Sequence, residues 1–62
     1  MKPIDFAALA KGEYLRFVGD VEGRVYQKTG LRSARRCSHL KHPVIHVRAR
    51  VQIIHHVEEE IL

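Results

Sequence analysis

Four side chains suited to metal binding lie close together in the middle of the sequence. They form the pattern C-x-H-x-x-H-x-x-x-H within ten residues: Cys37, His39, His42 and His46. A thiolate and three imidazoles can complete a tetrahedral zinc site. Zinc-finger ligands, however, come in two closely spaced pairs, and this pattern departs from that spacing. We therefore expect no cofactor and no metal, and we keep these four residues as ligands of an alternative Cys/His metal-binding module.

Positive charge is concentrated in one long block. Residues 24–57 contain eight Lys and Arg, no Asp or Glu, and all five histidines. Residues 1–23 and 58–62 each carry a net negative charge. Proteins that bind nucleic acid hold cations within reach of phosphates, because much of their affinity comes from counterion release. The block therefore predicts a small non-catalytic protein that binds DNA or RNA.

The candidate contacts are the cations of this block and the aromatic or imidazole groups near them. Arg48 and Arg50 come first, because alternating apolar residues predict a rigid strand through both of them. The other candidates are Arg35, Arg36, Arg32, Lys41, Arg24, Lys28, Tyr26, Tyr14 and His46. Tyrosines on a sheet face can stack on bases while arginines hold the backbone. Binding should tighten from about pH 8 to about pH 6, as histidine side chains gain charge.

The same charges suit a second class of partner. A basic face is also attracted to acidic protein surfaces, and a free strand edge can extend the sheet of another protein. The alternative function is therefore an interaction module or inhibitor that docks on an acidic surface of a larger protein or complex. Charges on the solvated face of an antiparallel sheet are ordinary. That explanation does not account for the missing carboxylates in residues 24–57.

Length and composition exclude several other classes. The 62 residues carry a net charge of +4, and 45% are hydrophobic, which is typical of a folded domain. We expect a single small basic domain over residues 1–62. The sequence contains no P-loop, dinucleotide fingerprint or nucleophile elbow. A core of this size also leaves little room for a walled pocket. We therefore expect no enzyme activity.

The cysteine count and the apolar runs bear on the compartment. The single cysteine, Cys37, excludes an internal disulfide, and no apolar run resembles a signal peptide or a membrane span. These features favour a reducing cytoplasmic setting and no membrane binding. Small domains without disulfides often gain stability from a second chain, so a homo-oligomer is one expected state.

The patterning predicts an α+β fold, a short N-terminal helix packed on a small antiparallel β-sheet that is open or barrel-like. Residues 4–11 are expected to form the helix, capped by Asp5 and ended by Gly12. A period of two predicts strands near 13–27 and 44–54. The first is either one strand bent at its glycines or a hairpin.

Two segments stay open between helix and other structure, 31–41 and the C-terminus from residue 55. Strand parity and the face of the expected helix together define the expected core. It comprises Phe6, Leu9, Leu15, Phe17, Val21, Val25, Ile45, Val47, Ala49, Val51 and Ile53.

Overall fold

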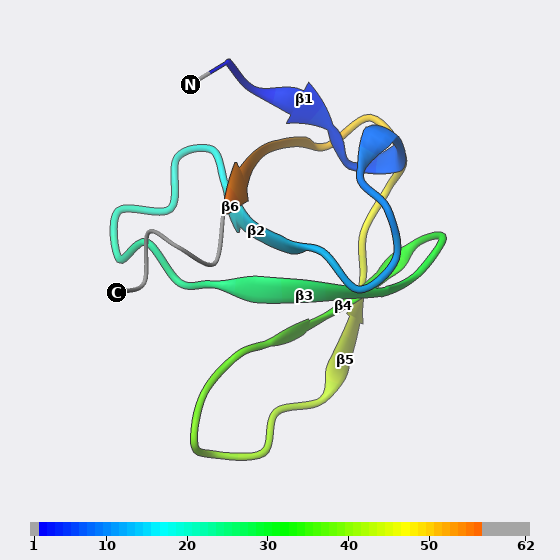
Figure 1. Cartoon of the computed structure of the whole chain (residues 1–62). Helices are drawn as coiled ribbons and strands as arrows, with labels where there is room; N and C mark the ends of the chain where they lie inside the picture. The colour runs from blue at the N-terminus through cyan, green and yellow to red at the C-terminus, as the bar shows by residue number, and fades with distance from the viewer. Residues whose placement is uncertain (1, 57–62) are drawn as a thin grey trace.

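The computed structural model of this protein describes residues 2–56 and consists mainly of one curled antiparallel sheet (Figure 1). Six strands form within this range: β1 (Ile4–Asp5), β2 (Tyr14–Phe17), β3 (Tyr26–Gly30), β4 (Ser33–Arg36), β5 (Val44–His46) and β6 (Gln52–His56). Their order in the sheet is β1-β6-β2-β3-β4-β5, and every neighbouring pair is antiparallel. No helix in residues 2–56 has the length and apolar character needed to cross a membrane.

The predicted α+β class is wrong, because the expected N-terminal helix is a single 3-10 turn, η1 (Phe6–Ala8). The Leu9 N–H donates to Phe6 O at 3.1 Å, and Leu9 itself is already extended. Asp5 makes no capping bond; its carboxylate accepts from the side chain of Gln52. Helix propensity is a weak preference that tertiary contacts override. Here one turn is enough to bring Phe6 and Leu9 into the core.

The first expected strand is a hairpin and not one bent strand. β2 and β3 pair with Tyr14 opposite Gln27 and Leu15 opposite Tyr26, and residues 18–25 connect them. Gly19 and Gly23 in this connection have φ of +88° and +63°, a region that glycine enters without steric cost.

The second expected strand and the segment before it also differ from expectation. Residues 44–54 divide into β5 and β6, separated by the turn segment 47–51, and residues 31–41 form a turn, β4 and part of a loop instead of a helix. The turn segment is tied to η1, because the Phe6 and Ala7 N–H groups donate to Val51 O and Ala49 O, each at 2.9 Å. His55 and His56 belong to β6. The rest of the expected C-terminal helix lies outside the described residues.

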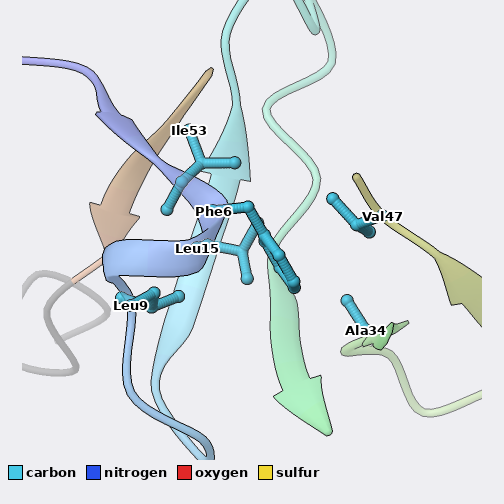
Figure 2. Packing of buried hydrophobic residues seen from close by; sticks show 6 residues of the cluster. All are labelled: Phe6, Leu9, Leu15, Ala34, Val47 and Ile53. Atoms are coloured by element: carbon cyan, nitrogen blue, oxygen red, sulfur yellow. The ribbon is translucent and has the colours of Figure 1, made fainter. Parts of the chain in front are cut away.

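Six buried hydrophobic residues form the core within residues 2–56 (Figure 2). They are Phe6, Leu9, Leu15, Ala34, Val47 and Ile53. The prediction is confirmed for all of these except Ala34, which had been placed in a possible helix. It is wrong for Val21, which is 99% exposed in the 18–25 connection, and for Ile45, which is 37% exposed on the outermost strand.

A buried lysine joins η1 to the sheet. Lys28 on β3 is only 3% exposed. Its Nζ donates to Phe6 O at 2.9 Å and to Leu9 O at 2.6 Å, and it lies 4.5 Å from the centre of the Phe6 ring. The two carbonyls and the ring face together satisfy the ammonium without a carboxylate. Lys28 therefore has a structural role inside the fold.

Candidate functional site

The acidic side chains in residues 2–56 are all engaged by neighbours. The carboxylate of Asp5 accepts from Gln52, and Glu13 Oε2 lies 2.6 Å from His55 Nε2. Their charges are therefore held on the side of the molecule built from β1, β2 and β6, away from the basic segments.

The two remaining carboxylates pair with the first arginine of the basic block. Arg24 Nε lies 2.8 Å from Glu22 Oε2 and 3.7 Å from Asp20 Oδ2. The charges of Asp20, and then Glu22, raise the pKa of the Arg24 guanidinium. Arg24 is therefore neutralised locally, which leaves it poorly placed to bind an anion.

Six other cations of the basic block form no ion pair within the described part of the chain: Arg32, Arg35, Arg36, Lys41, Arg48 and Arg50. Arg36 is half-buried and the rest are exposed. They occupy the turn before β4, β4 itself, the loop after it and the turn segment 47–51. Positive charge therefore lies at both ends of the β4–β5 hairpin, which spans residues 33–46.

One end of the hairpin carries Arg32, Arg48 and Arg50. The Val47 N–H donates to Arg32 O at 2.9 Å, which brings the start of the turn segment beside the β3–β4 turn. Arg48 and Arg50 stand on this turn segment and not on the rigid strand that alternation predicted. The turn segment is nevertheless held in place by its backbone hydrogen bonds to η1, as a strand would be by pairing with its neighbours.

The other end of the hairpin contains a hollow of about 290 Å³ beneath loop 37–43. We call it the loop hollow; its lining is Gln27, Arg35, Arg36, Cys37, Ser38, His39, Leu40, Lys41 and His42. Three cations and two imidazoles are among these residues, and no carboxylate is. Figure 1 shows the loop at the end of the hairpin, away from β1 and η1.

Two hydrogen bonds hold the residues around the loop hollow, one between backbone groups and one to a side chain. The Cys37 N–H donates to Val25 O at 2.8 Å, and the Leu40 N–H donates to Ser38 Oγ at 3.1 Å. His42 Nε2 is buried, and it has no hydrogen-bond partner among residues 2–56. A buried polar atom without a partner is costly.

The four possible metal ligands do not form a cluster. In the range 2–56, no three His, Cys, Asp or Glu side chains come together as a metal site. Cys37, His39 and His42 line the loop hollow, whereas His46 is exposed on β5, where it pairs with Ser33. The hollow is therefore better suited to an anion than to a cation.

The two candidate tyrosines, one on β2 and one on β3, lie on opposite faces of the sheet. Tyr14 pairs with Gln27, and Gln27 pairs with Arg35, which places these three in one row on the outer face. Tyr26 instead lies opposite Leu15 and packs edge-on against Phe17, with ring centres 4.8 Å apart.

This separation follows from the register of the hairpin. An even-numbered residue of β2 pairs with an odd-numbered residue of β3. Even-numbered residues of the two strands therefore lie on opposite faces of the sheet. Lys28 lies opposite Ala34 for the same reason. Sequence reasoning missed Gln27, Ser38 and Leu40 as lining residues. Only the glycines that mark the hairpin turn signalled the change of face.

The free thiol in the loop hollow has its own expected behaviour. Partial burial raises the pKa of Cys37. At about pH 8, less of it is thiolate than in a free cysteine, and the thiolate is the nucleophile. We expect iodoacetamide to alkylate Cys37 more slowly than glutathione in a competition followed by mass spectrometry. Faster alkylation of Cys37 would show that the neighbouring cations outweigh burial.

The arrangement is thus a set of cations that have no ion pair within residues 2–56 and lie at the two ends of one hairpin, with a hollow at one of those ends. Comparison of the chain with protein-family models, with curated proteins and with solved structures gave no match.

Proposed function

We propose that this protein binds nucleic acid, without catalysis, through the two basic ends of the β4–β5 hairpin. The observation that carries the proposal is the separation of charge. The described carboxylates already have partners, whereas six cations between Arg32 and Arg50 have no ion pair within residues 2–56. Such cations can contact phosphates without first giving up an existing ion pair, and counterion release then favours binding.

The residue types indicate how a nucleic-acid strand would be bound. Five of the six cations are arginines, whose guanidinium groups can grip phosphate oxygens in pairs. Phosphate contacts carry no base sequence, so we expect weak sequence preference. Tyr14 on the outer face, in register with Gln27 and Arg35, offers one ring for base stacking. This combination favours a single strand over a duplex. The single free cysteine, Cys37, fits activity in a reducing compartment such as the cytoplasm.

Fluorescence anisotropy with labelled single-stranded DNA, RNA and duplex DNA tests the proposal. Six contacts to a single strand predict a slope of about −4 for the logarithm of affinity against that of salt concentration. Between about 50 and about 200 mM salt, this slope corresponds to a loss of roughly 300-fold. The absence of binding at about 50 mM salt would overturn the proposal.

One observation favours the second candidate, an acidic protein partner. β5 is the last strand of the sheet, and its Val44 and Ile45 are 46% and 37% exposed. An exposed edge strand can pair with a strand of another protein. Polyglutamate and oligothymidylate matched in charge distinguish the two candidates. Tighter binding of polyglutamate would favour a protein partner.

A further inference from the structure

We propose that the loop hollow is a binding site for the terminal phosphate of a nucleotide, with the attached base lying over Gln27 towards Tyr14. The proposal rests on the proposed function and adds a specific ligand group to it. The terminal phosphate is a phosphomonoester, and it belongs either to a free nucleotide or to the end of a strand. Three features of the molecule support it: the charge of the hollow, its volume and the neighbouring row of outer-face residues.

The charge of the hollow suits a monoester better than a diester. Three cationic residues, Arg35, Arg36 and Lys41, line the hollow together with His39 and His42. Among residues 2–56, no carboxylate lines the hollow. A phosphomonoester carries about −1.5 to −2 at neutral pH, together with three strong acceptor oxygens. A phosphodiester within a strand carries only one negative charge. A site with this excess of cations therefore gains most from the doubly charged terminal group.

The volume of the hollow sets the size of the group that it takes. Its volume of about 290 Å³ is near the lower limit of small-molecule sites. It therefore accommodates one phosphate and its sugar, and no long segment of strand.

The outer-face row gives the base a place. Arg35 lines the hollow and is in register with Gln27, which is in register with Tyr14. Neighbouring strands are about 4.8 Å apart, so Tyr14 and Arg35 are separated by about 10 Å across the sheet. Gln27 lies between them and is held in place, because its Nε2 donates to Gly12 O at 3.2 Å. A nucleotide bound over Gln27 thus has cations at one end and an aromatic ring at the other.

Four probes of one sequence test the site by anisotropy or calorimetry: a short single strand with a 5′-phosphate, with a 3′-phosphate, or with neither, and the free nucleoside monophosphate. We expect at least one phosphorylated strand to bind about tenfold more tightly than the strand without a terminal phosphate, since one added phosphate meets three cations. Binding of the free nucleotide would identify a soluble ligand, and binding only of a phosphorylated strand would identify a strand end. Either result supports the site.

Two double variants separate this site from the rest of the interface. Arg36→Gln with Lys41→Gln should abolish the preference for a terminal phosphate while the unphosphorylated strand still binds. Arg48→Gln with Arg50→Gln should weaken every strand and retain the preference. Circular dichroism checks that both variants are folded.

Equal affinity of wild-type protein for all strands, without binding of the free nucleotide, would overturn the inference and leave the proposed function standing. Failure of every strand to bind would overturn the proposed function itself. Binding of the free nucleotide alone would then retain the hollow as a nucleotide site.

Discussion

Replacement of Lys28 by alanine is expected to destabilise the fold by about 3 kcal/mol or more. The change removes the buried stem, at about 0.8 kcal/mol per methylene group. It also leaves the carbonyls of Phe6 and Leu9 without the ammonium, at a cost of about 1–3 kcal/mol for each group left unsatisfied. Domains of this size have a free energy of unfolding of only about 3–9 kcal/mol. Urea unfolding followed by circular dichroism should show a much lower midpoint or an unfolded protein.

Two further variants show which part of Lys28 is responsible. Lys28→Met keeps most of the apolar stem and removes the charge, so we expect an intermediate loss of about 1–3 kcal/mol. Lys11→Ala removes an exposed lysine and should change stability by less than about 0.5 kcal/mol. A Lys28→Met protein as stable as wild type would contradict the account. It would mean that relief of the buried charge outweighs the lost hydrogen bonds.

Replacement of Arg48 and Arg50 by glutamine is expected to weaken single-strand binding about 20-fold at about 0.1 M salt. Each phosphate contact on a single strand contributes about 0.7 to the slope of log affinity against log salt. Loss of two contacts should therefore reduce the magnitude of the slope by about 1.4. Both arginines are exposed on a turn and have no ion pair within residues 2–56, so the fold should be unaffected.

The matched control is Lys2→Gln with Lys11→Gln. It removes the same charge from two exposed lysines outside the basic block. The control should reduce affinity only slightly, through the change in net charge. Equal losses in the two double variants would show that overall charge, and not the hairpin, determines binding.

Much of the core could be predicted from the sequence, because its apolar residues repeat at strand spacing. Leu15 and Ile53 were expected to face inward and are fully buried. Val21 had the same parity and is exposed, since parity holds only while a strand continues without interruption. The turn between β2 and β3 interrupts the strand. The conserved parity favoured one bent strand slightly over a hairpin, and the structure has the hairpin.

The chemistry of the site was only partly predictable. The absence of carboxylates from residues 24–57 marked the basic hairpin directly. The burial of Lys28 was not foreseeable, because its partners are backbone carbonyls of a 3-10 turn that the pattern assigned to a helix. The loop hollow was also missed. It is lined by loop residues and by Gln27 on β3, and no local sequence pattern predicts that these two segments come together.

The most direct test of the central claim is a residue-by-residue map of the binding surface. Uniformly ¹⁵N-labelled protein is titrated with a short single strand, and the backbone amide shifts are followed by NMR. The account predicts that the largest shifts lie at Arg32, in β4 and loop 37–43, and in the turn segment 47–51. The amides of residues 18–24, where Asp20 and Glu22 neutralise Arg24, should barely move. Shifts concentrated in residues 18–24, or no shifts at all, would contradict it.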